Sequence, residues 1–535
     1  MLHVSSNFDP DISMKSSNNN GRLWSLVSSD VETVTLNEDD QILERMGYKT
    51  ELYRGLSAFS NFAFGFTEVN VLCSFVSMYG YGLATGGPTV IFWGFAVTFV
   101  FNTIVAYSMA EICSAYPSAG SVYHWTGQLV PVSLAPLASY TCGWANFLGN
   151  AAGDAAFSYT WATFLSASIA ISGGEVLSTQ LLCLISIAVL LLWSFLNFFR
   201  IDTVGSFNHL AVFAHVGAIF FIIIACFTVA SPLESTAWVF TEYVNDTGFE
   251  SDVYVVMMGL LTGVYCFTGF EASAHMAEET HGSRTSAPNG VINTVLATGA
   301  GGLLVIVPVL YATANVDQSL NGTSGNAVVD SMSYSMSNRW ACIFAWVVTV
   351  NLFFAGVSSV AVTGRITWAL MRDNGFIYSS YFSVVDTYFQ SPIRAIMFVF
   401  GFDAILLLLT LNPGVGLAAF YSIVGLCAVG FNISYAIPIA AHLVFSTEKS
   451  FPLTCKSLGT YSKLFGIISC IWLIFTAILF FLPTEYPVTN SNMNWLCVVM
   501  LLVLIVGILN WILNSQYLFT GPKRIEKEVR TPLLE

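Results

Sequence analysis

Charged residues are scarce in this chain. They make up 9% of its 535 residues, whereas an ordinary soluble domain contains roughly 25%. Hydrophobic residues account for 55% of the sequence, and the mean hydropathy is +0.69. This composition excludes a typical soluble globular protein and indicates a membrane protein with many spans.

The sequence also lacks the motifs of several catalytic and energy-coupling proteins. None of its lysines follows the G-x-x-x-x-G-K-[ST] pattern that cradles nucleotide phosphates, which argues against an ATP-driven pump. The 7 histidines are scattered, the 11 cysteines include no C-x-x-C pair, and no hydrolase nucleophile with a matching base can be recognised. We therefore expect no enzyme activity, no metal site, no cofactor and no nucleic-acid partner.

Long hydrophobic runs are abundant. A membrane-crossing helix needs about 20 mostly apolar residues, and twelve segments meet or approach that length. They lie at about 57–80, 89–112, 137–170, 178–199, 206–230, 253–277, 291–314, 340–369, 394–411, 416–443, 464–482 and 494–515. The predicted fold is an all-α polytopic membrane protein with twelve transmembrane helices within residues 51–518, followed by a short cytosolic tail, 519–535.

Residues 1–50 precede the first span and are polar, as in "SSNNNGRLWSLVSSDVETVTLNEDD". Low hydrophobicity of this kind is typical of a disordered segment. The stretch has no basic start followed by an apolar centre, so we predict a cytosolic, disordered tail and not a cleaved signal peptide. Its serine content is compatible with a regulatory role and equally with none.

The basic residues predict the orientation of the spans. If the N-terminus is cytosolic and the spans alternate, all of the 18 Lys and Arg except Arg339 fall on the cytosolic side. This bias follows the positive-inside rule, and a miscounted helix would scatter it. We predict an even number of spans and cytosolic termini, in the plasma membrane or an endomembrane such as the vacuole. The same map puts the sequons at Asn245 and Asn321 outside, where we expect N-glycosylation.

Carboxylates occur within several predicted spans. They are Glu68, Asp154 and Asp403 near the middle of the first, third and ninth spans, and Glu271 and Glu278 in the later half of the sixth. An ionised acid near the bilayer centre costs about 2.5–3.5 kcal/mol, and only Arg365 is placed to offset any of them. Such acids point to a mobile cation: a proton, a sodium ion or an amine on a substrate. Glu68 and Asp154 are the coupling-ion candidates, and a protonated structural acid is the alternative.

The sixth predicted span is longer than a straight crossing needs. It runs from Val253 to Thr280, and small residues interrupt it around Gly269. Backbone groups freed by a broken helix are tolerated at membrane depth only where they line a cavity or meet a ligand. The first span has a matching interruption in "GFTEVNVLCS", residues 65–74. Interrupted helices at corresponding positions of two halves indicate the binding site of an inverted-repeat secondary transporter.

Motifs along nearly all of the chain beyond residue 40 resemble one transporter family. They include "ILERMGYKTELYRGLSAFSNFAFGF" before and into the first span, "SMAEICSAYPSAGSVYHW" after the second, "FTGFEASAHMAEET" in the sixth and "FFAGVSSVAVTGRITWALMRDNG" in the eighth. In their order and spacing the chain resembles the amino acid/choline transporter family of the amino acid-polyamine-organocation (APC) superfamily. Within that family it looks closest to the plant and fungal GABA permease and choline permease branch.

The resemblance implies two inverted five-helix repeats, at about 57–230 and 253–443, plus two further helices at about 464–515. It implies that substrate is held between the breaks of the first and sixth spans. The implied substrate-binding residues are Val71, Leu72, Cys73, Ser74 and Phe75 in the first break, and Phe267, Thr268, Gly269, Phe270 and Glu271 in the second. Amides of the first break would meet a substrate carboxylate, and carbonyls of the second would face its amine.

The chain departs from the family pattern at several of these positions. The family usually has a small hydroxyl residue and a glycine where this chain has Cys73 and Ser74, an apolar residue for Glu68 and an aspartate for Glu271. We predict a secondary active transporter that moves amino acids or related amines such as GABA by alternating access, with protons co-transported. A choline, ethanolamine or polyamine transporter is the alternative within transport, and a transporter-like nutrient receptor is the alternative outside it.

Overall fold

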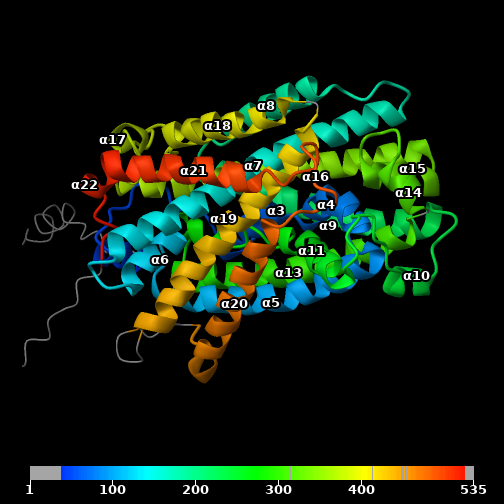
Figure 1. Ribbon diagram of the computed structural model, residues 1–535. Helices are drawn as coiled ribbons and strands as arrows, with labels where there is room; N and C mark the ends of the chain where they lie inside the picture. Colours follow the sequence, from blue (N-terminus) through cyan, green and yellow to red (C-terminus); the bar gives the residue numbers. More distant parts are fainter. Residues whose placement is uncertain (1–37, 314, 413, 447–450, 452–455, 525–535) are drawn as a thin grey trace, which may run out of the picture.

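The computed structural model describes residues 38–313, 315–412, 414–446, 451 and 456–524. Throughout that part of the chain the protein is helical, and the only extended pairings there are two isolated bridges, Leu56 with Thr280 and Thr85 with Asn245. Long helices lie side by side in one bundle, and short helices gather at its two ends (Figure 1). The predicted all-α class is confirmed.

The long helices follow the order of the predicted spans. Their bounds are α3 Ala58–Val69, α4 Val71–Ala84, α5 Gly87–Ala115, α7 Ala135–Ile171, α8 Thr179–Leu196, α9 Ile201–Val229, α11 Asp252–Tyr265, α13 Ser283–Tyr311, α16 Asn338–Arg372, α18 Ile393–Leu408, α19 Gly416–Phe445, α20 Ser462–Phe480 and α21 Leu496–Asn510. The short helices are α2 Glu38–Arg45, α6 Ser121–Leu129, α10 Thr236–Thr241, α12 Ala272–His275, α14 Val316–Leu320, α15 Ala327–Ser335, α17 Ser379–Phe382 and α22 Gln516–Leu518. Single turns of other helix types are η1 Ala277–Glu279, η2 Leu409–Leu411, η3 Gly459–Tyr461 and η4 Trp511–Ser515.

Ten helical segments of the described chain, with α3 and α4 counted as one, are long and apolar enough to cross a membrane. This establishes an integral, multi-pass membrane protein. Helices α7 and α11 fall outside that set, since α11 has only 14 residues and the 37 residues of α7 are rich in small and polar side chains. Because α7 packs along α16 and α19 in the interior, it has little need of a lipid-facing apolar surface. Twelve crossings in two inverted repeats therefore stay a prediction.

The two ends of the described chain meet at one end of the bundle. Helix α2 shows that the last part of the predicted N-terminal tail is folded, and residues 1–37 lie outside the described residues. The N–H of Lys523 donates to the Tyr48 hydroxyl at 2.9 Å, and its Nζ donates to the Gly47 carbonyl at 2.7 Å. Two chain ends on one face are what an even number of crossings would produce. That this face is cytosolic stays a prediction.

The two candidate glycosylation residues lie at the opposite end, where Figure 1 shows α10, α14 and α15. Asn245 is exposed and pairs with Thr85, which follows the last residue of α4. Asn321 is also exposed, and it follows α14, which packs against α4. Their glycosylation stays a prediction.

Candidate functional site

The first span is interrupted at a single residue, Asn70. It separates α3 from α4 in the left-handed conformation, with φ 31° and ψ 77°. Its N–H donates to the Phe66 carbonyl at 3.3 Å and so closes α3, while its Oδ1 accepts the N–H of Cys73 at 3.3 Å and caps α4. Asparagine tolerates the left-handed region better than most residues and is also a preferred N-cap. One side chain therefore ends one helix and starts the next.

This geometry corrects the predicted position of the first break. Residues 71–75 are not unwound, because they form the first turns of α4, and all five are buried. What they present at the break is a helix N-terminus, whose first amides have no acceptor within the helix and carry the positive end of its dipole. The Ser74 hydroxyl donates back across the break to the Val69 carbonyl at 2.8 Å. The amides of Val71 and Leu72 are thus the groups suited to a carboxylate.

The sixth span is interrupted over several residues, as predicted. Helix α11 ends at Tyr265 and α12 begins at Ala272, and irregular turns connect them. Gly269 has φ 84°, a left-handed conformation in which a side chain is strained, so glycine is required there. The Thr268 hydroxyl donates to the Tyr265 carbonyl at 2.8 Å and satisfies one of the last carbonyls of α11.

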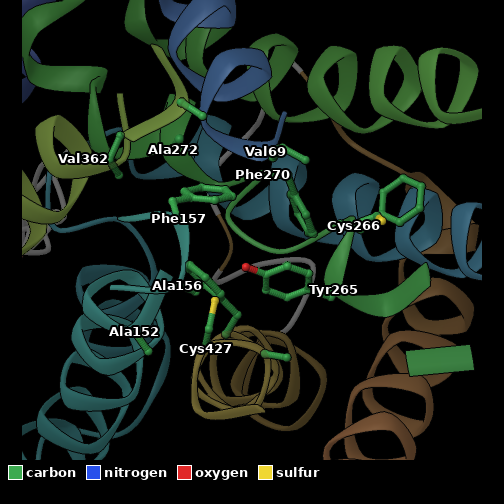
Figure 2. Packing of buried hydrophobic residues seen from close by; sticks show 14 of the residues in the cluster. Val69, Ala152, Ala156, Phe157, Tyr265, Cys266, Phe270, Ala272, Val362 and Cys427 are labelled. Atoms are coloured by element: carbon green, nitrogen blue, oxygen red, sulfur yellow. The ribbon is translucent and has the colours of Figure 1, made fainter. Parts of the chain in front are cut away.

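The two breaks lie against each other. A Cβ atom built on Gly269 would lie 3.1 Å from Oε1 of Glu68, which occupies the last turn of α3. Further along the same interface, Nδ2 of Asn61 donates to the Ser273 carbonyl at 2.8 Å, and the Ser273 hydroxyl donates to the Asn61 carbonyl at 3.2 Å. Figure 2 shows the apolar side chains packed in this region, among them Val69, Phe157, Tyr265, Phe270 and Cys427. The absence of a side chain at Gly269 leaves the Glu68 carboxyl facing the broken backbone.

Two predicted aromatic residues of the second break point to neighbouring helices. Phe267 lies against Phe95 and Phe99 of α5, with ring centroids 5.1 and 5.9 Å apart. Phe270 lies against Tyr435 of α19 at 4.9 Å. Their side chains therefore anchor the break to α5 and α19, and Glu68 and Glu271 supply its carboxyl groups.

Polar side chains from three helices surround Glu271. The Tyr435 hydroxyl donates to Oε2, and Nδ2 of Asn146 on α7 donates to Oε1 at 2.8 Å. The Tyr435 oxygen also accepts the N–H of Gly269 at 3.2 Å, which ties the broken backbone to α19. Nε2 of His275, one turn further along, lies 3.7 Å from Oε1. The carboxyl group of Glu271 thus has a donor on each oxygen and a histidine beside it.

Three other acids buried within the long helices have no basic partner among the described residues: Glu68 on α3, Asp154 on α7 and Asp403 on α18. Within that part of the chain, Oε2 of Glu68 and both carboxyl oxygens of Asp154 and Asp403 also lack a well-formed hydrogen bond. The hydroxyls of Ser359 and Thr363 on α16 lie beside Asp154. Burial of an unpaired carboxylate is costly, so these groups favour a bound proton or cation.

Glu278 is not an unpaired acid, which corrects the prediction that only Arg365 offsets the acids in the spans. Arg372, the last residue of α16, donates Nη1 to Oε2 of Glu278 at 3.0 Å and Nη2 to Oε1 at 3.1 Å. Nε of Arg365 donates to Oε2 of the neighbouring Glu279 at 3.1 Å. Both pairs lie between the breaks and the end of the bundle where the chain ends meet.

These ion pairs form part of a closure at that end, which we call the inner seal: Glu278, Glu279, Arg365, Arg372 and Asp373. The Ala119 N–H donates to Oε1 of Glu278 at 3.0 Å. Tyr48 and Tyr123 donate their hydroxyls to Oδ2 of Asp373 at 2.9 and 3.0 Å. Burial raises the pKa of Asp373 to about 6, and the neighbouring Arg372 guanidinium limits the rise. The seal joins the start of the described chain to the ends of the long helices on that side of the bundle.

The opposite end of the bundle is hollow. A cavity of about 290 Å³ lies between α4, α11, α19 and the loop before α21, lined by residues that include Met78, Tyr81, Leu261, Tyr421 and Asn494. Met78 stands about 10 Å beyond Val71 along α4, at 1.5 Å per residue. The cavity therefore lies at the end of the bundle opposite the inner seal.

The sequence of the helical region matches a known family over most of its length. Residues 56–504 match the family model described as amino acid permease. The chain belongs to the amino acid permease family. It is 30% identical over 496 residues to amino-acid permease BAT1 of Arabidopsis thaliana, an alignment that covers 90% of this chain and 95% of the relative.

Two further relatives of this permease support the assignment. The amino-acid permease BAT1 homolog of Oryza sativa subsp. japonica is 31% identical over 497 residues, which cover 90% of this chain and 94% of the relative. The GABA-specific permease of Saccharomyces cerevisiae is 27% identical over 475 residues, which cover 86% and 81% of the two chains. The permease is thus an amino acid transporter of the APC superfamily that works in a lipid bilayer on small-molecule substrates, and family membership implies a transporter and not an enzyme.

Four residues placed at the breaks of this permease were not predicted: Asn70, Asn146, His275 and Tyr435. Asn70 had a local signal, since an asparagine inside an apolar run is a natural left-handed N-cap. His275 had one too, because it stands four residues after Glu271, on the same side of a helical turn. Asn146 and Tyr435 had no local signal in the sequence, because they contact Glu271 only where α7 and α19 meet at that residue. The predicted substrate contacts themselves stay predictions.

Proposed function

We propose that this permease moves amino acids or related amines such as GABA across the membrane by alternating access, with protons co-transported. The observation that supports it is the pair of facing breaks, which bring the N-terminus of α4 together with the buried carboxyl groups of Glu68 and Glu271. A helix N-terminus attracts an anion, and a buried acid attracts a cation. Together they match the two charged ends of an amino acid.

The two ends of the bundle support alternating access. We propose that substrate approaches the breaks from the hollow end, and that the inner seal blocks its exit at the other end. Transport requires the reverse arrangement as well, in which the seal has opened and the cavity has closed. Through Glu271, the second break is hydrogen-bonded to Asn146 of α7 and Tyr435 of α19, so we propose that substrate binding at this break is passed on to those two helices.

The alternatives predict different substrates or no transport. Choline, ethanolamine and polyamines lack a carboxylate, so they would use the acids and leave the α4 N-terminus empty. A nutrient receptor would bind substrate and transport none. Uptake by purified protein in liposomes, screened across amino acids, GABA, choline, ethanolamine and polyamines, separates these classes. We expect saturable uptake of substrates that carry both an amine and a carboxylate; uptake restricted to choline or polyamines, or saturable binding without uptake, would contradict the proposal.

Gly269→Leu tests whether the second break is the site. The Cβ atom alone would lie 3.1 Å from Oε1 of Glu68, and a leucine side chain would extend beyond it into the break. We expect uptake to be lost while the protein still reaches the membrane. Gly401→Leu is the matched control, since a Cβ at Gly401 on α18 meets nothing within 4 Å. Normal uptake kinetics in Gly269→Leu would remove the sixth span from the site.

The proton-coupling part of the proposal rests on the buried acids without basic partners. Among them Glu68 faces the second break, whereas Asp154 lies on α7 beside the hydroxyls of Ser359 and Thr363. Either could hold a proton during transport, and Glu68 could instead pair with the substrate amine. Uptake driven by a pH gradient in sodium-free liposomes would support protons, and uptake that requires a sodium gradient would contradict them.

A further inference from the structure

The tautomer of His275 is fixed by its surroundings. Its Nδ1 lies 2.9 Å from the Ala119 carbonyl oxygen. A carbonyl can only accept, so Nδ1 carries a hydrogen and donates it. In the neutral ring Nε2 is then a bare acceptor, and it lies 3.7 Å from Oε1 of Glu271 with no hydrogen-bond partner among the described residues. Nε2 of His275 and Oε1 of Glu271 are thus two acceptors that face each other.

Both carboxyl oxygens of Glu271 accept hydrogen bonds. Asn146 donates to one of them and Tyr435 to the other. Neither side chain of the pair is exposed to any measurable degree, at 0% for each. A buried carboxylate needs a compensating positive charge. A proton on Nε2 of His275 would supply it at the observed distance.

The other charged groups near the pair are already engaged or carry the wrong sign. On the packed elements these are Glu68 of α3, Asp154 of α7, Arg284 in the first turn of α13, Arg365 of α16, and Glu278 and Glu279 of the segment after α12. Arg365 is bound to Glu279 and Arg372 is bound to Glu278. No ion pair between Arg284 and either member of the pair occurs in the described chain. His275 is therefore the group placed to neutralise Glu271.

We propose that His275 and Glu271 together hold the proton that moves with the substrate, with Nε2 of His275 as the atom that accepts it. The proposal rests on the proposed function, because it names the proton site of the same transport cycle. It also separates two roles that the sequence left open for Glu68. With the proton on His275, Glu68 remains as the carboxylate that faces the break and pairs with the substrate amine.

The proton movement balances without any other reactant. From the hollow end, a proton binds to Nε2 and forms an imidazolium, whose Nε2–H then faces the Glu271 carboxylate while Nδ1–H stays on the Ala119 carbonyl. After the inner seal opens, the proton leaves Nε2 for water, and the ring returns to its neutral Nδ1–H form. One proton crosses for each cycle and no bond other than N–H is made or broken. Two carboxylates, Glu68 and Glu271, are thereby matched by two positive charges, the amine and the proton.

His275→Asn is the variant that isolates this role. The asparagine amide nitrogen can take the place of Nδ1 and donate to Ala119, whereas the ionisable Nε2 is removed. The probes are radiolabelled alanine and radiolabelled GABA in sodium-free proteoliposomes with an inward proton gradient of one pH unit. One proton per substrate supports up to about tenfold accumulation under that gradient. We expect the wild type to approach this value and His275→Asn to equilibrate without accumulation, while still exchanging substrate in counterflow and losing the pH dependence of its apparent KM.

His215→Asn is the matched control. His215 is also fully buried, on α9, and it packs edge-on against Phe66 with centroids 4.9 Å apart. It does not contact Glu271, so we expect its variant to accumulate substrate like the wild type. A loss of accumulation in both variants would show that any buried histidine change uncouples transport, and the proposal would then be wrong.

The remaining outcomes distinguish this inference from the proposed function. Uptake of neither probe by the wild type would overturn the proposed function and this inference with it. Proton-driven accumulation by both the wild type and His275→Asn, with the same pH profile, would overturn only the role of His275. If His275→Asn fails to reach the membrane, Glu271→Gln decides: we expect exchange without accumulation, and wild-type accumulation in that variant would refute the shared proton.

Discussion

Arg372→Gln should open the inner seal. Arg372 joins the end of α16 to Glu278 through two hydrogen-bonded contacts of 3.0 and 3.1 Å, and its guanidinium lies over the Tyr48 ring at 4.1 Å. The variant removes the charge from one side of this pair and leaves Glu278 ionised in a buried place. The Glu278 carboxylate can regain water only if the seal separates. The closed arrangement is therefore destabilised relative to an open one.

The size of this effect follows from the burial of the pair. The side chains of Arg372 and Glu278 are 11% and 3% exposed. Removal of one partner from a buried ion pair costs about 3–5 kcal/mol, because the other charge is left unpaired. At the lower value the ratio of closed to open protein falls on the order of 100-fold. In a double variant with Glu278→Gln the cost should be smaller than in either single variant, since no buried charge is then left unpaired.

Labelling of a buried cysteine measures this opening. Ser118 is 1% exposed and precedes Ala119, whose N–H binds Glu278. In a Ser118→Cys background, a membrane-impermeant maleimide applied from the seal side should react slowly, and Arg372→Gln should raise the rate by one to two orders of magnitude. The labelling rate of the same protein without Ser118→Cys measures the reaction of the native cysteines and is subtracted. Arg394→Gln, a change at an exposed arginine stacked on Tyr381, should leave the rate unchanged. A wild-type labelling rate in Arg372→Gln would refute the reasoning.

Other predictions follow from the same structure. Glu68→Gln should weaken the apparent affinity for substrates with an amine at every pH, because Glu68 is proposed to pair with that amine. Loss of pH-driven accumulation with exchange retained would instead make Glu68 the proton carrier, and unchanged uptake kinetics would make it a structural acid. The pKa of Asp373 is raised from 3.8, its ordinary value in an unfolded chain, to about 6 in the folded protein. As the pH rises, the unfolded chain therefore releases this proton at a lower pH than the folded protein does. The stability that the protonated Asp373 side chain contributes is fully present below pH 3.8 and is lost as the pH rises through about 6. Asp373→Asn should thus gain up to about 3 kcal/mol relative to the wild type across that range in unfolding experiments, and parallel pH profiles would contradict this. Asn245→Gln and Asn321→Gln should each increase gel mobility in a eukaryotic host that glycosylates the protein, and unchanged mobility would place those loops away from the glycosylation machinery. Antibodies against a tag at either terminus should bind only after cells are permeabilised, so labelling of intact cells would reverse the predicted orientation.

The sequence alone determined the class of the protein and where its long helices lie. The length of an apolar run is a local property of the sequence, so the structure has a helix at each predicted span, including the less apolar α7. The interruption around Gly269 was also predictable, because a glycine among small residues in an overlong span indicates a helix break. This signal is local and does not depend on how the helices pack. At the first span the same reasoning found the interruption but misplaced it, since it followed the family pattern at residues 71–75 when Asn70 was the residue that could adopt φ 31°.

Only the tertiary structure decided which side chains pair with each buried carboxyl group. Glu278 and Arg372 are 94 residues apart, and Glu271 meets Tyr435 across 164. Sequence periodicity describes one helix at a time and cannot show which faces of distant helices meet, so it could not separate the paired Glu278 from the unpaired Glu68 and Asp154. That distinction depends on burial and on the few ångströms between side chains, because the cost of a buried charge is set by its neighbours. The sequence therefore determined that carboxyl groups enter the membrane, and the packing of α3, α7, α16 and α19 decided which of them have a basic partner among the described residues.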